Sequence, residues 1–136
     1  MASKDIARTL KPVQSIAPGL INATATGAAV DTLGYEGVVC VVDAGTRTDG
    51  THTPKLQDTV EDPASPGNPL ASGWADVAAA DLNGSFAAVA SNVLQWVGYR
   101  GGKRFVRGVS TVVAGATGAV YGAVILLGEP QKAPTA

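Results

Sequence analysis

The sequence has very few residues of the types that build disulfides, metal sites or charged surfaces. Among its 136 residues there is one cysteine, Cys40, and one histidine, His52. A single cysteine excludes an internal disulfide framework, and one residue of each type is too few for a zinc site. Charged residues make up 15% of the chain and the formal net charge is −1, which gives it no overall basic character. We therefore expect no cofactor, no metal ion and no nucleic-acid partner.

Long apolar runs are also missing. No stretch reaches the roughly 18–20 consecutive apolar residues of a membrane-spanning helix. The N-terminus lacks the apolar core of a signal peptide. We therefore expect no membrane partner. Cys40 lies in the short apolar run 38–42, where we expect it to be a small buried hydrophobic residue.

Residues that superficially match catalytic or ligand-binding motifs fail on their spacing. Around residues 101–103, a phosphate-binding loop would need glycine at Val97 and serine or threonine at Arg104. No serine has the nucleophile-elbow pattern, and His52 lies in a polar segment, so we expect a solvated loop histidine. The acids of the middle loops lack EF-hand spacing and are expected to be solvated turn residues: Asp43, Asp49, Asp58, Glu61 and Asp62. The sequence therefore indicates that the chain is not an enzyme.

What the sequence does contain is a series of β-strand patterns. β-branched and aromatic residues dominate 93–127, and we expect three strands there, at 93–100, 103–113 and 120–127. Gly101 and Gly102 are expected to form the turn of a hairpin between the first two strands, which would make the region a meander. The run 35–42 is apolar on both faces, which predicts a central strand.

The chain is expected to form a single all-β domain, a β-sandwich or jelly roll, over residues 20–127. Prolines favour extended backbone on both sides of it, so we expect an N-terminal arm at 1–19 and a C-terminal arm at 128–136. A Pro/Gly-rich surface loop is expected at 59–73, and a short helix at 78–84.

The candidate interface residues come from the two predicted arms, from the tryptophans and from the cluster of arginines. Extended arms gain order only by lying on another subunit. Arginine near a strand either protects a sheet edge or forms one side of a subunit contact, and the sequence leaves both interpretations open. Trp96 is expected in the core, whereas Trp74 is either core or an interface anchor. The candidates are Ile6, Leu10, Pro12, Trp74, Arg100, Arg104, Arg107 and Pro130.

Two stretches carry a resemblance to a known class of proteins. They are 37–45, Gly-Val-Val-Cys-Val-Val-Asp-Ala-Gly, and 97–107, Val-Gly-Tyr-Arg-Gly-Gly-Lys-Arg-Phe-Val-Arg, with the turn and strand that follow. The chain resembles small virion proteins of tailed bacteriophages, of the capsid decoration or cement type. The resemblance implies a self-associating subunit that is made in the host cytoplasm and binds the major capsid protein on the capsid surface. It transfers no functional residue.

Two other functions remain open. The chain could be a different virion component, such as a tail-tube, head–tail connector or tail-tip protein. It could also be a β-sandwich module that binds carbohydrate or a cell surface, although such modules display exposed aromatic residues and only 5% of this chain is aromatic.

Overall fold

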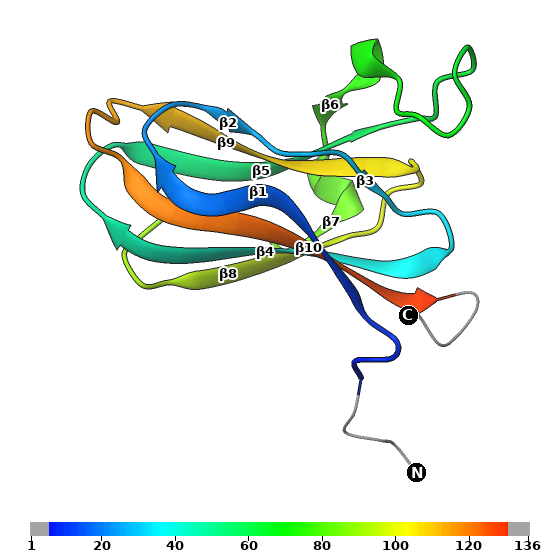
Figure 1. Cartoon of the computed structure of the whole chain (residues 1–136), viewed down its shortest axis with the longest axis horizontal. Coiled ribbons are helices and arrows are strands. Elements are labelled where there is room, and N and C mark those ends of the chain that lie inside the picture. Colours follow the sequence, from blue (N-terminus) through cyan, green and yellow to red (C-terminus); the bar gives the residue numbers. More distant parts are fainter. Residues whose placement is uncertain (1–5, 131–136) are drawn as a thin grey trace.

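A computed structural model describes residues 6–130, and within that range the chain forms ten β-strands and two short 3-10 helices (Figure 1). The strands are β1 (Lys11–Ile21), β2 (Ala25–Thr26), β3 (Val30–Asp31), β4 (Tyr35–Arg47), β5 (Thr51–Thr59), β6 (Ala75–Asp76), β7 (Leu82–Asn83), β8 (Leu94–Tyr99), β9 (Phe105–Val113) and β10 (Ala119–Pro130). The 3-10 helices are η1 (Ala71–Gly73) and η2 (Ala79–Asp81).

The strands form two antiparallel sheets that pack face to face. Sheet A has the order β1-β10-β4-β8-β7, and sheet B has the order β2-β9-β5-β6, with β3 also paired to β9. Figure 1 shows the two layers, with β9 and β5 above β10, β4 and β8. The predicted all-β sandwich is confirmed. The prediction that 35–42 forms a central strand is also confirmed, because β4 lies between β10 and β8.

The core lies between the two sheets and follows the two-residue alternation of the strands. Sheet A contributes side chains such as Cys40 and Ile125, and sheet B contributes Leu56 and Val106. Cys40 is buried as predicted. Burial raises the pKa of its thiol to about 12, so the thiol stays protonated and unreactive at neutral pH.

The predicted meander is wrong, although its three strands are present. β8 pairs with β4 in sheet A, whereas β9 pairs with β5 in sheet B, and β10 returns to sheet A. Gly101 and Gly102 therefore lie in a connection between the two sheets, not in a hairpin turn. Local sequence marks where a strand forms, but its partner depends on contacts between distant segments.

The prediction of two arms is wrong for 11–19 and 128–130, which belong to strands of the sandwich. Residues 11–21 form β1, which pairs with β10 from Lys11 opposite Leu127 to Ile21 opposite Ala119. Prolines fit here because β1 is an edge strand and its outward N–H groups need no partner. The C-terminal strand extends to Pro130, opposite Tyr35. Of the other residues of the predicted arms, 6–10 form a turn before β1, and 1–5 and 131–136 lie outside the described residues.

Two smaller expectations concern the segment between β5 and β8. Residues 59–73 do form an irregular excursion: it is closed by a bridge between Glu61 and Pro69, and 63–68 are exposed. The predicted helix at 78–84 is wrong, because only the single turn of η2 forms before β7 pairs with β8. Strand pairing supplies partners to the backbone that a short alanine-rich helix would leave unsatisfied at both ends.

Candidate interaction surface

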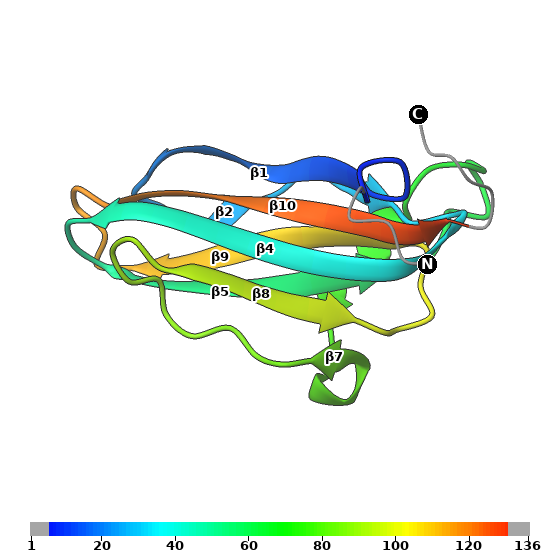
Figure 2. The same ribbon diagram turned by 90° about the horizontal axis from the view of Figure 1, so that it is seen from below.

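Three neighbouring strands of sheet A carry apolar residues on the face that points away from the core. In the register of the sheet, Val124 of β10 faces Val41 of β4, which in turn faces Trp96 of β8. Figure 2 views the molecule from the side of sheet A, where β10, β4 and β8 run side by side. We call this surface the apolar face and define it by Val39, Val41, Leu94, Trp96, Val124 and Leu126.

The apolar face is partly exposed and almost uncharged: Leu94 and Trp96 are exposed, and its other four residues are half-buried. The side chain of Trp96 is 66% exposed, whereas its neighbour Val97 points inward and is 1% exposed. Leu94, on the same strand, is 52% exposed. The only charged residue in 37–45, 94–98 and 120–128 is Asp43, which lies opposite Leu94. The prediction that Trp96 lies in the core is therefore wrong.

The N-terminal turn forms a groove at one end of this face. The groove has a volume of about 300 Å³ and is lined by Ile6, Thr9, Leu10, Gly37, Val39, Leu126, Gly128 and Glu129. A Cβ atom on Gly128 would lie only 3.2 Å from a methyl carbon of Leu10, so glycine here lets the leucine lie close to the sheet. Two of the predicted interface residues, Ile6 and Leu10, thus lie beside the apolar face, and Pro12 is exposed on β1.

Arg104 is engaged within its own chain. Its guanidinium donates hydrogen bonds to both carboxylate oxygens of Asp31, at 2.8 and 2.7 Å, and also pairs with Glu61. The hydrogen bonds from Arg104 lower the pKa of Asp31, and Asp31 in turn raises the pKa of Arg104. Arg104 therefore joins β3, the start of β9 and the 59–73 excursion, and these bonds use its donors within the chain.

Arg107 is also held on its own sheet, where it meets Trp74. Both Nε and Nη2 donate to the side-chain oxygen of Gln57, and the guanidinium lies 4.1 Å from the centroid of the Trp74 ring. Gln57 donates to Asp76, which pairs with Lys55 at 3.0 Å. β9 lies between β5 on one side and β2 and β3 on the other, so edge protection by Arg107 is ruled out.

The remaining predicted interface residues lie apart from these clusters. Arg100 is exposed, and its backbone N–H donates to the carbonyl of Asp81 at 2.8 Å. Pro130 ends β10 opposite Tyr35. The structure therefore groups the eight candidates into an N-terminal set beside the apolar face, a pair on sheet B, and separate residues near the strand ends.

His52 is a buried structural residue, which corrects the prediction of a solvated loop histidine. It lies in β5, its side chain points into the core, and it is 0% exposed. Nε2 lies 3.0 Å from the carbonyl oxygen of Asp49, and Nδ1 lies 2.9 Å from the hydroxyl of Tyr121. A carbonyl only accepts, so we assign the proton to Nε2 and let Nδ1 accept from Tyr121. The tyrosine oxygen then accepts from Ser110 at 2.6 Å, and every group has a partner.

Two of the predicted turn acids also act inside the fold. The carboxylate of Asp49 accepts hydrogen bonds from the backbone N–H groups of Gly118 and Thr117, which lower its pKa. Asp58 is buried, accepts a 2.8 Å hydrogen bond from Tyr99 and pairs with Lys103 at 3.5 Å. Among residues 6–130, no group of three or more histidine, cysteine, aspartate or glutamate side chains is arranged to hold a metal ion.

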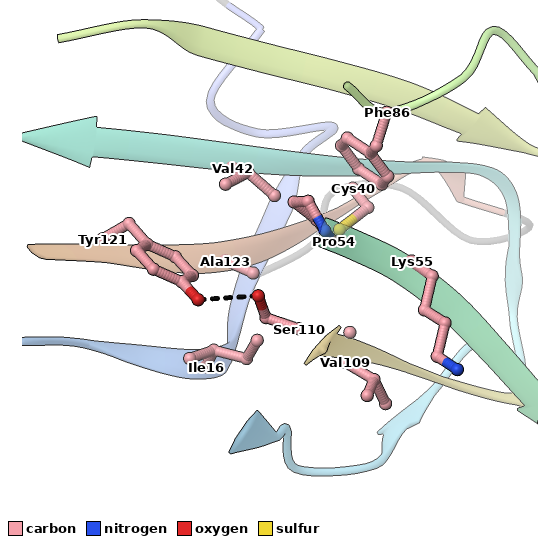
Figure 3. A pocket seen from close by; sticks show the side chains of 11 residues that line it. Ile16, Cys40, Val42, Pro54, Lys55, Phe86, Val109, Ser110, Tyr121 and Ala123 are labelled. Carbon is pink, nitrogen blue, oxygen red and sulfur yellow. Dashed lines mark hydrogen bonds between the residues drawn. The ribbon is translucent and has the colours of Figure 1, made fainter. Parts of the chain in front are cut away.

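The interior holds a very small cavity between the sheets. Figure 3 shows it beside Cys40, Phe86 and the hydrogen bond between Tyr121 and Ser110. Its volume is about 10 Å³, close to the space that one water molecule requires. This cavity is too small for an organic substrate.

Comparison with known proteins gives no relative from which a function could be transferred. No protein-family model matches the chain, and no curated protein or solved structure is significantly similar to it. Within the described part of the chain, none of the helices has the length and apolar character needed to span a membrane.

Sequence reasoning missed the apolar face, although a signal for it was present. The run 37–42 is apolar at both inward and outward positions, which indicates burial on both faces. In a sandwich of two sheets, however, each sheet has one face on the core and one face outside. An apolar run on both faces of a two-layer domain therefore marks a surface that can take a partner.

Proposed function

We propose that the chain is a structural virion subunit of the capsid decoration type, which binds and stabilises the outer shell of a tailed-phage head. The observation that carries the proposal is the apolar face, where the exposed Leu94 and Trp96 adjoin half-buried valines and Leu126 on the outside of the sandwich. Contiguous apolar surface on a small domain marks sites of association with other proteins. The resemblance of residues 37–45 and 97–107 to small phage virion proteins suggests which kind of assembly this is.

The physical mechanism is association, not chemistry. The major capsid protein and further copies of the chain would be the partners, on the capsid surface, after synthesis in the host cytoplasm. Each copy contributes a modest binding free energy, and many copies on one shell add up through multivalency. A rigid β-sandwich suits this role because little conformational entropy is lost when a preorganised surface binds.

The test is the copy number and position of the chain in purified particles of the virus that encodes it. We expect quantitative mass spectrometry to find it in amounts comparable to the major capsid protein, and electron microscopy to place it outside the shell. A copy number matching a single ring would favour the alternative virion roles, such as tail tip or connector. Absence from the particles would overturn the proposal.

A further inference from the structure

We infer that the apolar face is covered by the same face of a second copy, so that two A sheets pack against each other in a reversible dimer. The inference rests on the proposed function, in which the partners are the major capsid protein and further copies of the chain. It assigns the apolar face to a further copy, so that the dimer would meet the shell through its other surfaces.

The first argument is that the apolar face is built like an interior surface. On β4, the inward residues Val38, Cys40 and Val42 alternate with the outward residues Val39 and Val41, and both sets are apolar. Interfaces between identical subunits resemble a protein core cut in half. A sheet with apolar residues on both sides fits between two apolar layers. Sheet B of the same chain supplies one of these layers, and a partner would supply the other.

The second argument is charge. Asp43 is the only charged residue of the three central strands in the region of this face, so the face offers no pattern of charge for a strongly charged partner. A two-fold axis that crosses the strands near Val41 would reverse the strand direction of the second copy. The two Asp43 carboxylates would then lie at opposite ends, roughly 13 Å apart along the strands. Self-association therefore need not bring like charges together.

The third argument is area. The apolar face lies on β10, β4 and β8, and β1 extends it along one side. Nine residues on each of β1, β10 and β4 and the six residues of β8, at about 4.8 Å strand spacing and about 3.3 Å rise, give a projected area of about 520 Å² per copy. Two such faces bury about 1,000 Å², and side-chain relief adds to this projection, so the total approaches the ~1,200 Å² lower end of specific interfaces. The groove beside Ile6 and Leu10, whose lining also includes the charged Glu129, extends the same surface. This area predicts a dimer that forms and dissociates with concentration.

The fourth argument is shape. β-sheets pack face to face at about 10 Å separation when their strands lie within about 30° of each other, an angle that arises from their common right-handed twist. Two copies of sheet A have the same twist by identity. Trp96, the largest and most exposed side chain of the face, supplies the kind of aromatic anchor that dominates binding free energy.

Sedimentation velocity of the full chain over a wide concentration range tests the inference. We expect the wild type to change from monomer to dimer, and Trp96→Glu to raise the dissociation constant at least about 30-fold, as loss of an interface anchor does. The matched control is Leu33→Glu, because Leu33 is also 66% exposed but lies in the loop between β3 and β4. The control should dimerise like the wild type.

A second measurement avoids any dependence on how Trp96→Glu folds. Trp74→Phe leaves Trp96 as the only tryptophan, and its fluorescence emission should move to shorter wavelength as concentration rises and the indole leaves water. An emission spectrum that does not change with concentration would contradict the inference. So would a wild-type chain that stays monomeric at all concentrations, or equal weakening by Trp96→Glu and Leu33→Glu.

The proposed function and the proposed dimer can be contradicted independently. A monomeric chain that decorates phage heads in high copy number would overturn only the dimer. A dimer that is absent from the particles would overturn only the proposed function. A monomer that binds decoration-free shells through Trp96 would show that the shell, not a second copy, covers the apolar face.

Discussion

The two sheets share one interior, but their outer faces differ in chemistry. On sheet B, polar side chains contact one another across the strands, from Lys55 through Asp76 and Gln57 to Arg107. On sheet A, the corresponding surface carries valine, leucine and the exposed Trp96. Sheet B therefore finds its outer contacts within the chain, whereas sheet A leaves a surface whose burial requires another molecule.

This difference departs from the usual pattern of antiparallel sheets. Antiparallel sheets usually have one apolar face on the core and one polar face in water. β5 follows that pattern, with Thr51, Thr53, Lys55 and Gln57 facing outward, but β4 and β10 do not. The side chains of the apolar face therefore lie outside the core that stabilises the monomer.

The largest expected effect is the loss of stability when the two leucines near the end of β10 are replaced by alanine. Leu127 points into the core and is 1% exposed, whereas Leu126 lies on the apolar face. Leu127→Ala should lower the free energy of unfolding by about 2–5 kcal/mol because it leaves a cavity in the core. Leu126→Ala should cost less than about 1 kcal/mol in urea denaturation of the dilute monomer. Equal costs would mean that the apolar face is packed within the chain.

The two tryptophans should differ by a smaller amount. Here the residue beside sheet B, Trp74, is expected to stabilise the monomer more than Trp96 of the apolar face. Trp74 lies under the Arg107 guanidinium, a contact that stabilises by about 0.5–1 kcal/mol, so Trp74→Ala should destabilise the dilute monomer by about 1 kcal/mol. Trp96→Ala should change monomer stability by less than about 0.5 kcal/mol, because an exposed side chain loses few contacts. A double-mutant cycle with Arg107→Ala isolates the stacking contribution. A larger loss from Trp96→Ala than from Trp74→Ala in the monomer would reverse the comparison.

The strands of this fold could be predicted from local sequence, but their pairing could not. The runs 35–42 and 93–127 are rich in β-branched residues, which mark extended backbone. Nothing in the connection at Gly101 and Gly102 shows whether the next strand pairs with its predecessor or crosses to the other sheet. That choice depends on which distant strand, β4 or β5, offers a free edge.

The candidate site was harder to predict because exposure is a property of the assembled fold. Trp96 has the local sequence of a core residue, and only the position of β8 in sheet A points its side chain outward. His52 shows the reverse error, since a polar neighbourhood suggested solvent while strand alternation directs the ring inward to Tyr121. Ile6 and Leu10 were identified as interface candidates, and they do lie beside the apolar face, but the apolar face itself was missed.

The smallest expected effect is the loss of stability at acidic pH that comes from the Asp31–Arg104 ion pair on sheet B. The Arg104 guanidinium holds the pKa of Asp31 below its usual value, so this ion pair contributes stability above about pH 4, the unfolded pKa. The contribution is lost as the pH falls through the lowered folded pKa, because the protonated carboxyl no longer attracts the arginine. Asp31→Asn should therefore lower the free energy of unfolding at neutral pH, by less than about 1 kcal/mol for this half-exposed pair.

Urea denaturation across the acid range measures this effect and its origin. The difference between the wild type and Asp31→Asn should shrink as the pH falls below about 4. In an Arg104→Gln background, Asp31→Asn should cost less, and the remaining pH dependence should be weaker, because the main cause of the lowered pKa is gone. A pH-dependent difference of the same size in both backgrounds would show that another group holds the Asp31 carboxylate. Arg104 would then stabilise the ionised form of Asp31 less than the two hydrogen bonds between these residues suggest.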